Sequence, residues 1–280
     1  MTNKSFTDNV DELAEMLTHK RPLFVLTGAG CSTASGIPDY RDKEGNWKHQ
    51  QPVQFQAFCE QEHTRKRYWA RSMLGWPRVS EAAPNPVHFA LAKLEGANLI
   101  QHLITQNVDG LHQKAGSEKV IDLHGNLETV TCLSCKEQLT RQTVQQWLID
   151  NNASIDHETP EIAPDGDVSL ENINFDAFNV MSCPRCSGIL KPDVVFFGES
   201  VPRSRVQQAM AELKSANAVL IIGSSLMVFS GYRFCREATA TGKAIYAVNL
   251  GTTRADNELT LKLNFDCGEV LSTLIERMRL

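Results

Sequence analysis

The sequence predicts an α/β fold in which a parallel sheet is flanked by helices and interrupted by two additional segments. Three observations predict it: short apolar runs recur along the chain, helical stretches separate several of them, and three runs end in glycine or hydrogen-bonding residues. A chain of 280 residues, 42% of them hydrophobic, can bury one large core and still form a satellite module.

The predicted strands are continuous apolar runs rather than alternating ones. Such runs are typical of strands buried on both faces, as in a parallel sheet between two helical layers. Helical spacing of apolar residues covers residues 8–20, and a second helix is predicted over 202–215. Alternating strands and helices imply crossover connections. The predicted strands are residues 23–26, 99–104, 194–197, 219–222 and 244–248.

A glycine-rich turn, Gly28-Ala29-Gly30, directly follows the first predicted strand. Residues without bulk let the backbone approach a pyrophosphate, and a following helix N-terminus would supply amide donors. The next glycine is Gly36, so the G-x-G-x-x-G spacing is not completed. On this segment alone, a dinucleotide-binding turn and a plain strand-to-helix turn remain equally compatible.

Two later strands end in similar residues. The run 219–222 leads into Gly223-Ser224-Ser225, and the run 244–248 leads into Asn249-Leu250-Gly251. Open α/β sheets bind ligands in the crevice at the carboxyl ends of their strands. Three such strand ends therefore predict one shared crevice and a Rossmann-like, nucleotide-binding domain.

A polar cluster follows the predicted strand 99–104. Gln106, Asn107 and Asp109 can donate or accept hydrogen bonds and could fix a ribose and a carboxamide. His124 follows a short apolar segment and precedes Gly125, and a neutral imidazole there could act as a general base. Spacing alone does not favour this role over that of a structural histidine.

Four of the eight cysteines form two Cys-x-x-Cys pairs. Two such knuckles supply the four thiolates of a tetrahedral zinc site, and a site filled by four cysteines leaves no position for water or substrate. A thioredoxin-like redox pair is the alternative, but two pairs are hard to explain as one dithiol. The sequence predicts one structural zinc ion bound by Cys132, Cys135, Cys183 and Cys186.

Two segments interrupt the alternation of strands and helices. Residues 43–85 are rich in aromatic and basic residues and are predicted to form a helical insertion. Residues 129–190 contain the paired cysteines and a polar loop, and are predicted to form the zinc-binding module. The Rossmann-like domain would then comprise residues 1–42, 86–128 and 191–280.

Composition argues against several classes of partner. The net charge is −5 and no long basic run occurs, so neither nucleic acid nor an anionic membrane is expected as a partner. No apolar stretch reaches the roughly 20 residues of a membrane-spanning helix. The first twenty residues contain Asp8, Asp11, Glu12 and Glu15, which fits neither a transit peptide nor a secretory signal. A cytoplasmic location is expected.

Taken together, these segments closely resemble the sirtuin family. The resemblance covers residues 23–268 and rests on Gly28 to Ser32 with Gly36 to Arg41, Thr105 to Asp109, Leu123-His124-Gly125, the cysteine quartet, Lys191 to Glu199 and Gly223-Ser224-Ser225. A narrower similarity to the class II branch, and within it to bacterial members, rests on residues 67–71, 75–77 and 163–168.

The resemblance implies an NAD-dependent protein-lysine deacylase that cleaves NAD to nicotinamide and transfers the acyl group to ADP-ribose. It implies that His124 is the general base and that Asn107 positions the ribose. It further implies that NAD is bound by Gly28, Ala29, Gly30, Ser32, Asp39, Tyr40, Arg41, Gln106, Asn107, Val108, Asp109, Gly223, Ser224, Ser225, Asn249, Leu250, Gly251 and Cys267, and acylated lysine by Val195, Phe197, Gly198 and Glu199.

Other functions share part of this pattern. A mono-ADP-ribosyltransferase would use the same NAD pocket with a different acceptor. An NAD dehydrogenase is disfavoured by the displaced third glycine, and a non-catalytic zinc-ribbon module that binds nucleic acid is disfavoured by the acidic balance. Tyr68 and Arg71 have the Tyr-x-x-Arg spacing with which class III sirtuins recognise acidic acyl groups, although the surrounding residues resemble class II.

Overall fold

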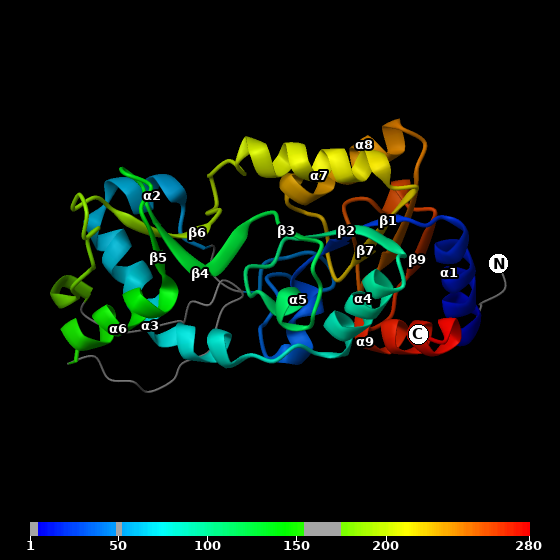
Figure 1. Ribbon diagram of the computed structural model, residues 1–280, viewed down its shortest axis with the longest axis horizontal. Coiled ribbons are helices and arrows are strands. Elements are labelled where there is room, and N and C mark those ends of the chain that lie inside the picture. The colour runs from blue at the N-terminus through cyan, green and yellow to red at the C-terminus, as the bar shows by residue number, and fades with distance from the viewer. Residues whose placement is uncertain (1–4, 49–51, 154–174) are drawn as a thin grey trace.

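Parallel strands form the larger of two sheets in the computed structural model, which describes residues 5–48, 52–153 and 175–280 (Figure 1). The spatial order is β3-β2-β1-β7-β8-β9. The chain first adds β2 and β3 on one side of β1, and then adds β7, β8 and β9 on the opposite side of β1. This is the doubly wound arrangement, whose ligand crevice lies where the order reverses, between β1 and β7. The strands are β1 (Leu23–Thr27), β2 (Ile100–Thr105), β3 (Val120–Asp122), β7 (Ala218–Ile222), β8 (Ala244–Val248) and β9 (Leu261–Leu263).

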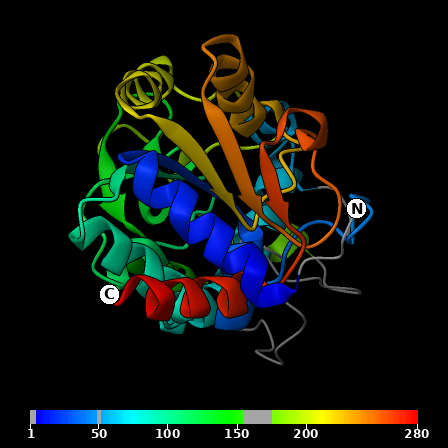
Figure 2. The same ribbon diagram turned by 90° about the vertical axis from the view of Figure 1, so that its right-hand side faces the viewer.

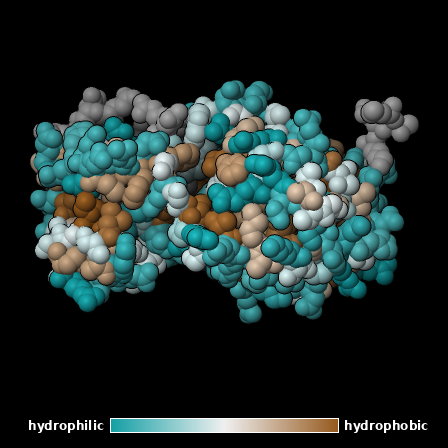
Figure 3. All heavy atoms as spheres, turned by 90° about the horizontal axis from the view of Figure 1, so that it is seen from above, coloured by the Kyte–Doolittle hydropathy of each residue, from teal (hydrophilic) through white to brown (hydrophobic). Residues whose placement is uncertain are grey.

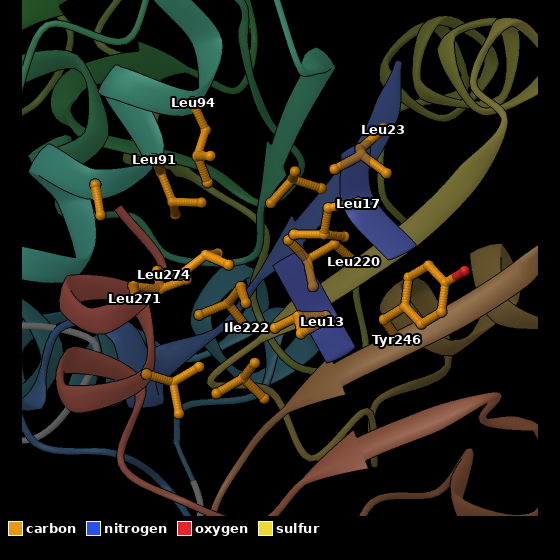
Figure 4. Packing of buried hydrophobic residues seen from close by; sticks show 14 of the residues in the cluster. Leu13, Leu17, Leu23, Leu91, Leu94, Leu220, Ile222, Tyr246, Leu271 and Leu274 are labelled. Carbon is orange, nitrogen blue, oxygen red and sulfur yellow. The ribbon is translucent and has the colours of Figure 1, made fainter. Parts of the chain in front are cut away.

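Helices cover both faces of this sheet (Figure 2). Every residue of β1 is buried, and successive side chains pack into different clusters: Leu23 and Val25 into one, Phe24 and Leu26 into the other. The first cluster joins the sheet to α1 (Phe6–His19), α4 (Pro86–Gly96) and α9 (Cys267–Met278), whose leucines interleave in Figure 4. The second joins it to α7 (Arg203–Ser215) and α8 (Phe229–Ala240).

Local sequence sets where three of these helices begin. Ser5 and Asp8 form a capping box at α1, so that two otherwise unpaired backbone amides gain partners. The Asn85 side chain accepts from the Val87 amide at α4, where Pro86 occupies the first helical position. The Asp266 side chain caps α9. These caps fix where α1, α4 and α9 begin, the three helices that cover one face of the sheet.

The smaller lobe is built on an antiparallel sheet with the order β5-β4-β6. Its core contains Phe58, Trp69 and Phe196. Arg141 is fully buried there; its guanidinium donates to the Ser72 carbonyl at 3.1 Å. The elements are α2 (Phe55–Glu60), α3 (Glu62–Glu81), β4 (Gly125–Cys132), β5 (Gln138–Thr140), α6 (Arg141–Asn151) and β6 (Leu190–Val194).

Four of the five predicted strands are confirmed as β1, β2, β7 and β8, and the helix predicted over 202–215 is confirmed as α7. The prediction that residues 194–197 form a strand of the parallel sheet is wrong. The strand β6 ends at Val194 and pairs antiparallel with β4, and the apolar side chains that follow line a cavity instead. An apolar run is expected both in a buried strand and along the wall of an apolar cleft. Such a run therefore does not by itself identify a strand.

The glycine-rich turn does not lead into an α-helix. Two short 3-10 turns follow it, η1 (Ala29–Cys31) and η2 (Thr33–Ser35). The three-part division of the chain stays a proposal; β4 and β6 extend across the boundaries at 128/129 and 190/191. Residues 163–168 lie outside the described residues. Among the helices that the structure describes, none is long and apolar enough to cross a lipid bilayer.

Candidate active site and zinc centre

A cavity of about 720 Å³ opens at the carboxyl ends of β1 and β7, where the strand order reverses. Its volume lies within the range of small-molecule sites, roughly 300–1,000 Å³. Both lobes contribute to its wall: the turns after β1, β2 and β7 on one side, and residues 194–201, which begin at the last residue of β6, on the other. On the face that carries α7 and α8, hydrophobic surface gathers between hydrophilic regions across the middle of the molecule (Figure 3).

The glycines of the first wall let two turns touch each other. The Gly30 amide donates to the Gly223 carbonyl at 2.9 Å. A Cβ on Gly28 would lie 2.7 Å from the Ser224 Cβ, and one on Gly223 would lie 2.5 Å from the Cys31 amide nitrogen. Gly223 also has a φ of +60°, which favours glycine. Packing of the two turns at the switch point therefore already requires glycine at these positions.

The polar cluster after β2 is tied to this turn by a chain of hydrogen bonds. Asn107 Nδ2 donates to the Gly28 carbonyl at 3.1 Å and to Ser32 Oγ at 3.0 Å. Ser32 Oγ donates to Asp109 Oδ2 at 2.6 Å, and the other Asp109 oxygen accepts from the Leu111 amide. These bonds hold an amide and a carboxylate at fixed positions on the cavity wall, as recognition of a polar ligand requires.

Hydrogen bonds define the tautomer of His124. Its Nδ1 lies 2.9 Å from the Gln106 carbonyl oxygen, which can only accept, so Nδ1 carries the proton. Its Nε2 is left as an acceptor and lies 2.8 Å from Ser230 Oγ, which donates to it. Burial lowers the pKa of His124 to about 4, and the nearby Arg205 and Arg233 charges act in the same direction. The imidazole is therefore neutral at physiological pH and presents a lone pair at Nε2.

Two further histidines lie behind Asp109. His112 is 1% exposed and its Nε2 lies 3.0 Å from Thr27 Oγ1. The fully buried His88 packs against His112 with ring centroids 4.8 Å apart and the two rings tilted by 58°. Burial lowers the pKa of His112 to about 3 and also lowers the pKa of His88. Both rings are neutral supports of the site.

This buried pair predicts that acid destabilises the protein. Unfolded histidine has a pKa near 6.5, so between pH 6.5 and about 3 the unfolded chain binds more protons than the folded chain. Stability present above pH 6.5 is lost as the pH falls, at up to about 1.4 kcal/mol per pH unit from His112, and the lowered pKa of His88 acts in the same direction. Urea unfolding at pH 5.5 and 4.5 measures this slope. We expect a shallower slope for His112→Gln, and equal slopes would contradict the assignment.

The second wall of the cavity is largely apolar. The rings of Tyr40, Trp47 and Phe197 cluster, with centroids 5.4 Å apart for Trp47 and Phe197. The Val195 amide donates to the His124 carbonyl at 2.8 Å, which joins this wall to the histidine. The Glu199 carboxylate accepts from the Phe196 amide and from the Lys191 ammonium, so it braces the turn. Such a wall can pack against an aliphatic chain.

The cysteine quartet converges in the smaller lobe. The sulfur atoms of Cys132 and Cys186 are 3.6 Å apart, those of Cys135 and Cys183 are 3.7 Å apart, and all four lie within 4.8 Å of one another. Tetrahedral ligands at 2.3 Å from a zinc ion would be about 3.8 Å apart. None of the four forms a disulfide. The donor set and its spacing fit a zinc ion whose coordination is complete.

Nearly all the residues predicted to contact NAD or acyl-lysine line this one cavity, together with His124. Gly251 and Cys267 do not. Gly251 packs against the Lys43 backbone, and the buried Cys267 thiol donates to the Val248 carbonyl. Tyr68 is buried in the core of the smaller lobe, and neither it nor Arg71 lines the cavity.

Several cavity residues were missed by sequence reasoning. They include Lys43, Trp47, Phe229, Ser230 and Arg233. Ser230 is the hydrogen-bond partner of His124, yet 106 positions separate the two residues. No local pattern connects them, because folding alone brings the first turn of α8 to the residue that precedes β4.

The sequence profile described as "Sir2 family" matches residues 28–230, which is more than half of the chain. The chain belongs to the Sir2 family. As a sirtuin, it resembles the "NAD-dependent protein deacetylase" of Xanthomonas campestris pv. campestris, with 53% identity over 96% of this chain and 92% of that relative. The "NAD-dependent protein deacetylase 2" of Bradyrhizobium diazoefficiens is 54% identical, and the match covers 94% of this chain and 96% of that relative.

Solved sirtuin structures share this fold along nearly the whole chain. One described as "Sir2-p53 peptide-NAD+" has a TM-score of 0.76 and 33% identity, covering 95% of this chain and 96% of that chain. Another, "Sir2 bound to acetylated peptide", has a TM-score of 0.76 and 32% identity, covering 95% and 97%. The sirtuin resemblance seen in the sequence is thereby confirmed, while the narrower class II assignment stays a prediction.

Proposed function

We propose that this chain removes acyl groups from lysine side chains of proteins, with NAD as its co-substrate. The observation that carries the proposal is the neutral His124, whose Nε2 lone pair lies on the wall of a cavity at the switch point of a Sir2-family sheet. Relatives that share more than half of their residues with this chain are NAD-dependent protein deacetylases. Acetylated and other acylated lysines are the proposed substrates.

The residues of the first wall would hold the co-substrate. When bound, NAD would supply an ADP-ribosyl group that loses its bond to nicotinamide and accepts the acyl group, while one water molecule completes the release of the lysine amine. Asp109 and the Val108 backbone are proposed to bind the carboxamide, and Asn107 with Gln106 to bind a ribose. The turns that contain Gly28 and Gly223 would cradle the phosphates. The fixed amide and carboxylate positions support this assignment.

His124 would take a proton at Nε2 from a ribose hydroxyl. Ser230 Oγ donates to this nitrogen in the structure, so it marks the position from which a substrate hydroxyl would donate. The Gln106 carbonyl accepts from Nδ1 and would stabilise the imidazolium that forms. Val195, Phe197 and the backbone of Gly198 and Glu199 are proposed to enclose the acyl-lysine.

An assay with an acetyl-lysine peptide and NAD tests the proposal. We expect nicotinamide, O-acetyl-ADP-ribose and deacetylated peptide in equal amounts, detected by mass spectrometry. Nicotinamide release with label from NAD appearing on protein would instead indicate mono-ADP-ribosyl transfer. Reduction of NAD, followed by absorbance, would indicate a dehydrogenase. Omission of peptide is the control, since a deacylase then forms no acylated product.

A cytoplasmic location is also proposed. Proteins, and neither nucleic acid nor membranes, are the proposed partners, and the net charge of −5 supports that choice. Tyr68 and Arg71 do not line the cavity, which disfavours an acidic acyl group as the preferred substrate.

A further inference from the structure

Three arginines surround an exposed aromatic ring at the start of α8. Phe229 is 46% exposed, and the guanidinium carbons of Arg233, Arg236 and Arg254 lie 5.3, 5.9 and 6.0 Å from its ring centroid. We call these four residues the arginine rim. Cation–π contacts of this length hold the guanidinium groups together although they repel one another. The rim is thus a local concentration of positive charge on a chain whose net charge is −5.

Within the residues that the structure describes, no carboxylate lies within ion-pair distance of the rim, and the nearby acidic group, Glu258, is engaged elsewhere. None of the three arginines forms an ion pair there. The Glu258 carboxylate accepts instead from the hydroxyls of Tyr232 and Thr239. The Arg233 Nε is buried without a hydrogen-bond partner, which leaves a donor unsatisfied. An anion that bound here would therefore gain partners that the protein itself does not supply.

The rim joins the cavity to the outer surface. Phe229, Ser230 and Arg233 line the cavity, and Ser230 contacts His124 one helical turn before Arg233. The charge of Arg233 also acts on the pKa of His124, which is consistent with this proximity. Arg236 and Arg254 are exposed. The positive charge therefore begins at the cavity wall and continues outward, away from the reacting groups.

We propose that the arginine rim binds carboxylates of acidic residues that flank the acyl-lysine in the substrate protein. This inference rests on the proposed deacylase function and adds a sequence preference to it. An acidic acyl chain would need its cation inside the cavity, whereas two of the three arginines lie outside it. A protein segment that leaves the cavity over Phe229 can meet all three.

Acetyl-lysine peptides that differ only in their flanking residues test the inference. One peptide carries Asp and Glu beside the lysine, and its partner carries Asn and Gln. We expect kcat/KM to be at least about fivefold higher for the acidic peptide at low salt, which corresponds to roughly 1 kcal/mol, and the ratio to shrink in 0.5 M NaCl. Arg233→Gln and Arg236→Gln should each lower the ratio, and Arg233→Lys should lower it less than Arg233→Gln.

Each arm has an outcome that would overturn the inference. Equal kcat/KM values for the two peptides in the unmodified enzyme would refute it without any variant. A preference that persists in both Arg→Gln variants would place recognition elsewhere. If Arg233→Gln changes only the KM for NAD, the rim serves the co-substrate; if it impairs only a succinyl-lysine peptide with neutral flanks, it serves the acyl group. Absence of deacylation on every peptide would refute the proposed function instead. Arg279→Gln, at the distant C-terminus, is the matched control.

Discussion

Replacing His124 with alanine is expected to lower kcat for deacylation by about 10²–10⁴-fold, the usual contribution of a general base. The imidazole is neutral, its Nδ1 proton is fixed by the Gln106 carbonyl, and its Nε2 lone pair lies at the cavity wall. Alanine removes the proton acceptor but leaves the glycine turns and the Asn107–Ser32–Asp109 chain in place. Product formation under saturating NAD and acetyl-peptide measures the loss, and calorimetry measures NAD affinity.

Two variants separate the chemical role of His124 from a structural one. His63→Ala removes an exposed histidine of the smaller lobe and should leave both rate and NAD affinity unchanged. Ser230→Ala removes the donor to Nε2 without removing the base, so we expect an effect of only a few fold. If His124→Ala kept the original turnover, His124 would be excluded from the mechanism. If it lost turnover and NAD affinity together with thermal stability, a supporting role would explain the result.

The sequence was sufficient for those parts of the fold that depend on local patterns. Buried parallel strands require apolar runs, and the turns at the switch point require glycine, so β1, β2, β7 and β8 could be located directly. The same reasoning failed for residues 194–197, because a run that lines a cavity is as apolar as one that enters a sheet. A helix was expected after Gly30, and two 3-10 turns stand there instead. The incomplete glycine pattern does not determine which of the two conformations follows the turn.

The candidate site was predicted where its residues follow strand ends and was missed where they do not. Asn107 and Asp109 come directly after β2, so their place on the cavity wall follows from topology. Ser230 and Arg233 lie one turn apart on α8, and nothing in the helix sequence shows which face meets the cavity. The role of His124 could be inferred only from the family resemblance. It depends on a tautomer that is set by the Gln106 carbonyl, 18 positions earlier in the sequence.

Removal of one quartet cysteine is expected to unfold much of the smaller lobe. Cys132 is the last residue of β4, and Cys183 and Cys186 precede β6, so a zinc ion there would join the ends of two paired strands. Structural zinc contributes folding free energy directly, about 10–16 kcal/mol in isolated zinc-finger peptides. Metal analysis should find about one zinc ion per chain, and Cys132→Ser should lose the metal, lower the melting temperature and abolish most activity.

The exposure of the four cysteines distinguishes metal binding from simple packing. Cys132 is buried and Cys186 is exposed, although both belong to the quartet. If zinc holds the lobe together, Cys186→Ser should lose metal and stability as Cys132→Ser does, because each removes one of four ligands. If the cysteines only fill space, the exposed position should tolerate serine. Cys59→Ser, a partly exposed cysteine outside the quartet, controls for loss of a thiol as such. A metal-free chain that is fully folded and active would refute the zinc assignment. Parallel losses in the two quartet variants would instead establish that zinc coordination, and not burial of the cysteines, maintains the cavity wall formed by residues 194–201.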